Sequence, residues 1–312
     1  MKLGTTTLSV TTAGRPRQQA TGGGGGGGGS GSALTNDLAY DGFFSQNKSA
    51  LDFSNSSYNS FSSSTSTHNS LDTFIDHNSS RLYGAYNTAH YYTWANAGQA
   101  YSGFGGFYSV GTRSDFAGQQ ASYLGNTGRG ITIAYLGDQT PVIVIGRSGG
   151  SNRLDFYSYP GTAHLGYMTV RVGGGGSGYN PGSNNDMSGI AFDGTNLLMM
   201  NRNQSYMWAY PMPADTSAIN NGVMDTVAQW SMPTTLQYGL AWTGDGVIMG
   251  KGGSPTEVAY VRLSGSGFTG TSTSIRTYSM GSSNNYSLAV DYKNRKLIVG
   301  GYSNNFYRVF SE

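Results

Sequence analysis

The sequence predicts an all-β protein, and within that class a five-bladed β-propeller that follows an extended N-terminal arm. The first observation is a hairpin-like pattern, two short apolar runs around a polar turn, that recurs about every 50 residues. The second is the composition: 49 Gly and 23 Tyr among 312 residues, with 11% charged residues, suit short strands and tight turns better than helices. The third is that the last copy of the pattern lacks one strand, as expected where a ring closes on itself.

The clearest copy of the pattern is IAFDGTNLLMMN, residues 190–201. The apolar runs are Ile190–Phe192 and Leu197–Met200, and Asp193-Gly194 between them is a hairpin signal. Similar copies occupy residues 240–250, 288–301 and 132–146, and a weaker one occupies residues 73–86. We therefore expect five blades, at approximately 70–111, 130–172, 187–233, 237–281 and 286–312.

Two further strands follow the hairpin in each of the first four units. We expect these pairs at 91–94 and 106–110, 154–157 and 168–172, 206–210 and 227–230, and 258–262 and 275–278. The inner strands are rich in small or β-branched residues, which suits a crowded axis.

The fifth unit supplies strands at 288–290, 296–299 and 306–310, and then the sequence ends. A strand from the N-terminal side, near 49–53, is expected to complete this blade and remove an exposed sheet edge. The propeller would then span residues 38–312, with a low-complexity loop at 60–70. A β-sandwich or a β-solenoid is the alternative fold, because short, evenly spaced strands are common to all three.

Residues 1–37 form the predicted arm. Thr5–Thr12 is β-prone, with Leu8 and Val10 on one face of an extended strand, and a basic turn with Arg15 and Arg17 follows. Eight glycines from Gly22 to Gly29 are typical of a flexible linker, or of a thin tether for a strand that adds to a partner's sheet edge. We take Leu8, Val10, Arg15 and Arg17 as the candidate docking residues.

The charge and the residue types present exclude several kinds of partner. A formal net charge of +2 gives no electrostatic case for nucleic acid, and the absence of Cys excludes disulfides and thiolate chemistry. No apolar run reaches the length of a membrane span, so membrane insertion is not expected. The first residues contain no apolar region of signal-peptide length, so export by a classical signal is not expected.

The sequence offers no catalytic, cofactor or metal set, so we expect a protein that is not an enzyme. One aspartate recurs in or beside the turn of each unit, where Asp caps its own backbone: Asp76, Asp138, Asp193, Asp245 and Asp291. Catalytic carboxylates would instead stand singly, at distinct positions. His68, His77, His90 and His164 have no metal-ligand spacing. The glycine runs at 103–106 and 173–178 lack the context of a phosphate-binding loop.

Aromatic side chains are the remaining candidates for ligand binding. Tyr and Trp rings stack on sugars when exposed, which makes Trp94, Tyr206, Trp208 and Tyr210 candidates for a glycan site. The same residues lie in predicted strands, where packing between neighbouring blades is the competing interpretation.

A β-prone N-terminus (Thr5–Thr12), a Gly/Ser tether (Gly22–Ser32) and a β-domain rich in Ser, Thr, Asn, Tyr and Gly without Cys occur together. In this organisation the chain resembles virion structural proteins of tailed bacteriophages, of the tail-fibre, head-fibre or decoration type. The resemblance implies attachment through the arm to capsid or tail proteins, a multimeric assembly, and a propeller that faces outward and can bind host glycans. It also implies a location in the virion, assembled in the host cytoplasm and later extracellular. A free-standing lectin-like propeller and a glycoside hydrolase or lyase propeller are the alternatives.

Overall fold

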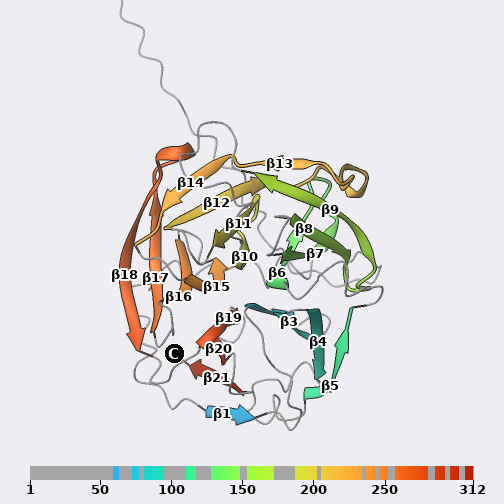
Figure 1. Cartoon of the computed structure of the whole chain (residues 1–312). Helices are drawn as coiled ribbons and strands as arrows, with labels where there is room; N and C mark the ends of the chain where they lie inside the picture. Colours follow the sequence, from blue (N-terminus) through green and yellow to red (C-terminus); the bar gives the residue numbers. More distant parts are fainter. Residues whose placement is uncertain are drawn as a thin grey trace, which may run out of the picture. The chain divides into compact units, whose positions relative to one another are not determined.

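The strands that a computed structural model describes in this chain gather into five sheets (Figure 1). The structure describes residues 59–62, 72–76, 81–86, 88–94, 110–116, 128–147, 153–171, 187–201, 205–233, 237–242, 246–251, 257–279, 285–291, 296–301 and 306–311. The chain divides into two units, Met1–Ser30 and Gly31–Glu312, and all described residues belong to the second.

The sheets are called I to V here, in the chain order of their first strands. Sheet I contains β2 (Asp72–Asp76), β3 (Arg81–Tyr86), β4 (Thr88–Trp94) and β5 (Val110–Asp115). Sheet II contains β6 (Gly128–Tyr135), β7 (Pro141–Arg147), β8 (Arg153–Ser158), β9 (His164–Arg171) and the later β13 (Val223–Asp225). Sheet III contains β10 (Met187–Phe192), β11 (Asn196–Asn201), β12 (Tyr206–Pro211) and β14 (Ala228–Ser231). Sheet IV contains β15 (Gln237–Trp242), β16 (Gly246–Lys251), β17 (Glu257–Ser264) and β18 (Thr271–Ser279). Sheet V contains β19 (Asn285–Asp291), β20 (Lys296–Gly301), β21 (Phe306–Ser311) and β1 (Asn59–Ser62).

The first strands of the sheets contact one another in a closed cycle. β2 contacts β6, β6 contacts β10, β10 contacts β15, β15 contacts β19, and β19 contacts β2. Neither a sandwich nor a solenoid makes such a cycle, so the predicted class, an all-β propeller, is confirmed. The number of blades in the whole chain stays a prediction, because the described ranges leave gaps between them.

Sheet V is completed by a strand from the N-terminal side. β1 pairs antiparallel with β21, with Asn59 opposite Val309 and Phe61 opposite Tyr307. This strand replaces the expected loop at residues 60–62, while the predicted strand near 49–53 and the rest of the loop at 60–70 lie outside the described residues. NSFS has little strand propensity of its own, and its ladder partners lie at the other end of the sequence, where no local pattern reveals them.

Two outer strands also differ from expectation. The fourth strand of sheet I is β5, Val110–Asp115, which shares only Val110 with the predicted 106–110, and residues 106–109 lie outside the described residues. The strand β13 was not expected at all. The sequence VGTRSD does not alternate apolar and polar residues, so the period-two pattern of a half-buried strand does not mark it. In sheets II, III and IV the third and fourth strands cover the predicted positions almost completely.

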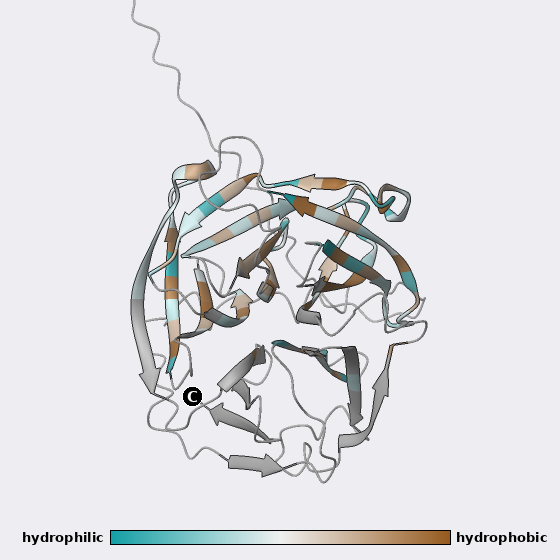
Figure 2. Cartoon of the chain, viewed as in Figure 1, coloured by the Kyte–Doolittle hydropathy of each residue, from teal (hydrophilic) through white to brown (hydrophobic). Residues whose placement is uncertain are grey.

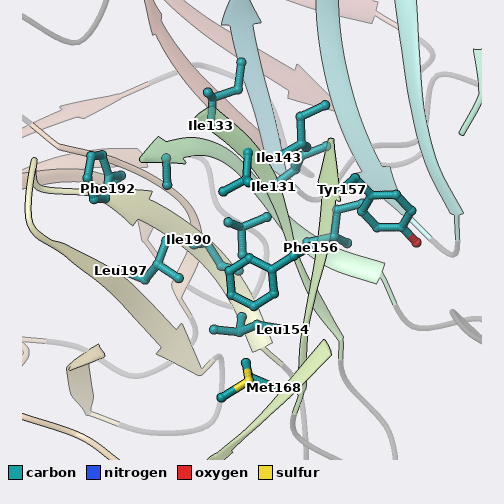
Figure 3. Packing of buried hydrophobic residues seen from close by; sticks show 14 of the residues in the cluster. Ile131, Ile133, Ile143, Leu154, Phe156, Tyr157, Met168, Ile190, Phe192 and Leu197 are labelled. Carbon is teal, nitrogen blue, oxygen red and sulfur yellow. The ribbon is translucent and has the colours of Figure 1, made fainter. Parts of the chain in front are cut away.

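The core lies between the faces of neighbouring sheets. Every residue of β10 is buried, because a first strand is covered on both faces by the sheets beside it. Ile190 and Leu197 of sheet III lie beside Leu154 and Phe156 of sheet II (Figure 3). Figure 2 shows apolar and polar residues mixed along the outer strand β9, where only Met168 and Val170 are buried. Each fully buried large apolar side chain contributes about 1.5–3 kcal/mol to stability.

Candidate functional site

Asp72, the first residue of β2, is completely buried although it is an acidic residue. Backbone N–H groups of three other sheets donate hydrogen bonds to its carboxylate. Ile131 and Ile190 donate to Oδ2 at 3.2 and 3.0 Å, and Leu240 donates to Oδ1 at 3.4 Å. The donors belong to β6, β10 and β15, so the carboxylate lies where the first strands of sheets I to IV meet. We call this carboxylate with its three donors the axial site.

Bulges at the beginning of the donor strands help to direct these N–H groups toward Asp72. The pairing register shifts between Gly128 and Gly130 in β6, between Met187 and Gly189 in β10, and between Tyr238 and Leu240 in β15. A bulge places one extra residue in a strand and takes nearby backbone groups out of the regular ladder. The pairing of β2 with β3 runs without such a shift, and Asp72 stands at its end.

Glycine allows the first strands to approach closely around the axial site. A Cβ on Gly189 would lie 2.9 Å from the carbonyl carbon of Gly239 and 2.9 Å from the backbone nitrogen of Leu240. A Cβ on Gly130 would lie 2.6 Å from Cγ1 of Ile190. Sheets II, III and IV therefore meet backbone against backbone, as the small residues of the inner strands predicted.

A second polar group, called the Asp155 cluster here, consists of Arg153, Asp155 and His164 on β8 and β9. Nε of Arg153 donates to Oδ2 of Asp155 at 3.1 Å, and Nη2 donates to Oδ1 at 3.0 Å. His164 Nε2 lies 3.0 Å from the same Oδ1. The guanidinium of Arg153 also lies over the ring of Tyr167, with its Cζ 4.1 Å from the centroid.

The Asp155 cluster stands at the junction of sheets I and II. The His164 ring lies 5.0 Å from that of Tyr157, which in turn meets Phe116 edge-on at 5.1 Å. Phe116, directly after β5, packs against Tyr83 of β3. Arg81, also in β3, donates from Nη1 to the carbonyl oxygen of Pro160 at 2.6 Å. Aromatic packing and one cross-sheet hydrogen bond thus join the two sheets here.

The Asp155 cluster has the geometry of a structural ion pair. The carboxylate is 0% exposed, and Arg153 engages both of its oxygens in the bidentate manner that fixes two groups most firmly. His164, with 28% of its side chain exposed, is the member of the cluster that solvent reaches most. The cluster can hold the β8–β9 hairpin in place and present His164 at its edge.

The predicted glycan-binding aromatics lie mostly in the core. Trp208 and Tyr210 are completely buried, Tyr206 is half-buried with its ring 6.2 Å from that of Trp208, and Trp94 ends β4. Burial raises the pKa of the Tyr210 hydroxyl, and the charge of Asp225 adds to the effect. In the part of the chain that the structure describes, Trp208 Nε1 and Tyr210 Oη have no hydrogen-bond partner. Neither ring can stack on a sugar in this conformation, so packing between sheets is the role that the structure gives them.

Two of the recurring aspartates, Asp138 and Asp193, cap their turns as the sequence predicted. Asp193 accepts from the backbone N–H groups of Thr195 and Asn196 at 2.8 and 2.6 Å. Asp138 accepts from the N–H of Thr140 at 2.9 Å, so both residues cap their turns. Asp76 and Asp291 end β2 and β19, Asp76 being buried, and Asp245 lies outside the described residues.

Several predicted residues cannot be compared with the structure. The docking residues Leu8, Val10, Arg15 and Arg17 lie outside the described residues, as do His68 and His77. His90 lies within β4.

In the described ranges no group of three or more His, Cys, Asp or Glu side chains could hold a metal ion. No helix within those ranges has the length and hydropathy needed to span a membrane.

Sequence reasoning missed Asp72, Arg153 and Asp155, although each left a signal. Asp72 immediately precedes the weakest copy of the hairpin pattern, where the other copies carry no acid. Asp155 lies inside the predicted strand 154–157, between Leu154 and Phe156. An acidic residue in a strand that is buried on both faces requires a partner, and that requirement was the available signal.

No family model matches this sequence, and no curated protein matches it. Solved structures resemble it at low identity. Glutaminyl cyclase from Myxococcus xanthus is 8% identical, with a TM-score of 0.48, over 81% of this chain and 92% of that chain. A chain of the mitotic checkpoint complex is 10% identical, with a TM-score of 0.41, over 84% and 97%. The Cps50 (Swd1) β-propeller domain from Myceliophteria thermophila is 10% identical, with a TM-score of 0.39, over 75% and 66%. At such identities the likeness concerns the fold and does not extend to activity or ligands.

Proposed function

We propose that this chain is a non-enzymatic structural protein, which presents a rigid propeller within a larger assembly and is attached to it by the N-terminal segment. The observation that carries the proposal is the axial site. One carboxylate bonded to the backbone of three other sheets fixes the inner strands relative to one another. The carboxylate of Asp72, a group of the protein itself, also occupies the point where these strands converge. This arrangement suits a rigid structural protein better than a reaction site.

Two buried carboxylates of the described residues, Asp72 and Asp155, lie outside the repeated turns and support a role without catalysis. A glycoside hydrolase needs two carboxyl groups that face the bond to be cleaved. Asp72 accepts from backbone donors and Asp155 from Arg153, and both are 0% exposed. Each carboxylate is thus already engaged by groups of this chain.

Attachment is proposed through Leu8, Val10, Arg15 and Arg17. A β-prone segment before a run of glycines suits a strand that adds to a sheet edge of a partner. The resemblance to phage structural proteins suggests a virion as the assembly, with capsid or tail proteins as partners and the propeller outward.

The test of attachment uses the full chain. Leu8→Asp with Val10→Asp places charges on the face that would pack on the partner, and Thr7→Asp with Ser9→Asp places them on the opposite face. The first pair is expected to abolish co-sedimentation with the native particle, while the matched second pair reduces it much less. Normal incorporation of the Leu8/Val10 variant would contradict the proposal.

Glycan binding by the displayed propeller is a secondary proposal, and the half-buried Tyr206 is the candidate aromatic that favours it. A glycan array probed with the full chain tests it. Binding that disappears in Tyr206→Ala and survives in Tyr238→Phe, a change within the core, would support it. Silence across the array would count against it.

A further inference from the structure

The three donors of the axial site have the chemistry of an anion receptor. Backbone N–H groups that point at one place carry partial positive charge and bind carboxylates or phosphates. Ile131, Ile190 and Leu240 contribute these groups from three different sheets, and they converge on the two oxygens of one carboxylate.

The receptor and its ligand come from separate parts of the fold. Asp72 belongs to sheet I and is 59, 118 and 168 residues away from its three donors in sequence. The donor strands β6, β10 and β15 contact one another directly, β6 with β10 and β10 with β15. Their spacing is set by close backbone contacts at Gly130 and Gly189, in which Asp72 takes no part. Sheets II, III and IV can therefore keep the three N–H groups in place when the aspartate side chain is removed.

We propose that the axis of this propeller is a carboxylate-binding site, formed by the N–H groups of Ile131, Ile190 and Leu240, which Asp72 occupies as a built-in ligand. A free carboxylate of matching size takes that place when the side chain is shortened. The site does not depend on the function proposed above, since it concerns the ring itself.

The size of the accepted ligand follows from what each substitution removes. Asp72→Ala removes the carboxyl group, and formate supplies the same atoms. Asp72→Gly removes the Cβ as well, and acetate replaces both. Because Asp72 is completely buried, the space left by Asp72→Ala accommodates formate and not acetate, whereas that left by Asp72→Gly accommodates either.

The experiment measures Tm for the full chain at constant ionic strength in sodium chloride, formate or acetate. Asp193→Ala, which removes a half-buried turn cap, is the matched control. Both Asp72 variants are expected to melt roughly 10 °C below the wild type in chloride, because three buried donors lose their acceptor. Formate raises the Tm of Asp72→Ala by several degrees and acetate does not, while both raise that of Asp72→Gly. The Tm rises because the anion binds the folded state and not the unfolded state. The Tm of the wild type is the same in all three salts, and so is the Tm of Asp193→Ala.

Asp72→Asn keeps the side-chain volume but turns an N–H₂ group toward N–H donors. It is expected to be destabilised and to respond to neither salt, because its site is full. A wild-type Tm for Asp72→Asn would overturn the proposal, since the carboxylate would then be unnecessary. Equal Tm values for Asp72→Ala in chloride and formate would also overturn it. If Asp72→Ala folds in none of the three salts, formate has failed to restore folding, and this result would also overturn the proposal.

Discussion

The axis and the rim of this propeller join neighbouring sheets in different ways. At the axis, a single side chain, Asp72, bonds to the backbone of three other sheets. At the rim, the chain between the third and fourth strands of one sheet reaches back to the outer strand of the sheet before it. Its backbone then pairs with that strand, and no side chain is needed for the pairing.

The rim contact is seen at two successive junctions. β13, between β12 and β14 of sheet III, runs parallel to β9 of sheet II, where the N–H of Thr169 donates to Gly222 at 2.8 Å. Gly270, between β17 and β18 of sheet IV, forms a parallel bridge with Trp230 of sheet III. There the N–H of Ser231 donates to Gly270 at 3.0 Å, and the N–H of Gly270 donates to Gln229 at 3.1 Å.

The difference between the axis and the rim determines how far the effect of a substitution should spread through the ring. Each rim contact joins two sheets and satisfies part of one outer edge, so its loss should remain at one junction. The axial carboxylate serves three sheets at once. A change at the axis should therefore weaken the whole ring.

The largest effect is expected for Asp72→Asn. The amide presents a donor to backbone donors, and at least one buried N–H loses its acceptor, which costs about 3–5 kcal/mol of unfolding free energy. Guanidinium chloride unfolding of the full chain measures the loss. Asp193→Asn is the control, because an asparagine oxygen still caps that turn, and its midpoint should match the wild type. Equal midpoints for the two variants would contradict the contrast between axis and turn.

Gly189→Ala should destabilise the axis by a smaller amount, about 1–3 kcal/mol. The new Cβ would meet backbone atoms of Gly239 and Leu240 at 2.9 Å, and backbone yields less easily than a side chain. Gly194→Ala is the comparison: no atom lies within 4 Å of the new Cβ, and its cost arises from a φ of +96°. That cost is about 1 kcal/mol. A loss of Tm in Gly189→Ala no larger than that in Gly194→Ala would show that the axis is not tightly packed.

The sequence allowed the hairpins of this axis to be predicted but not the residue that joins them. β10 and β11 pair within one short stretch, and Asp193-Gly194 forms their turn through bonds to residues two and three positions away. Such local pairing leaves a pattern that a reader of the sequence can follow. Asp72 finds its donors 59 to 168 residues away, at strands whose bulges no residue type announces. A closing strand from the N-terminal side was predicted, but not the position of β1, for the same reason: its partner β21 lies at the far end of the chain.

Gly270→Ala tests the rim and is expected to cost about 1–2 kcal/mol. The new Cβ would lie 2.4 Å from Cδ1 of Trp230 and 2.7 Å from the carbonyl oxygen of Gln229. The Trp230 side chain is half-buried and can move aside, which limits the loss. Amide hydrogen exchange followed by mass spectrometry should show faster exchange near 229–231 and unchanged exchange at β6 and β10. Faster exchange around the whole ring would contradict a local role for the rim.

The smallest effect is expected at the exposed pair of Arg171 and Asp225, which joins β9 to β13 beside the backbone contact. Nη2 of Arg171 donates to Oδ2 of Asp225 at 2.8 Å, and this bond holds the pKa of the Asp225 carboxyl below its usual 3.8. A carboxyl group with a lowered pKa stabilises the fold above its unfolded pKa, and the contribution disappears as the pH falls through the lower, folded pKa. Asp225→Asn should therefore unfold slightly more easily than the wild type at pH 7, with the difference fading below about pH 4. Urea midpoints measured from pH 3 to pH 7, at low and high salt, test this. A difference that persists at pH 3 would mean that Asp225 acts through packing, and the rim would then depend on side chains more than its backbone pairing suggests.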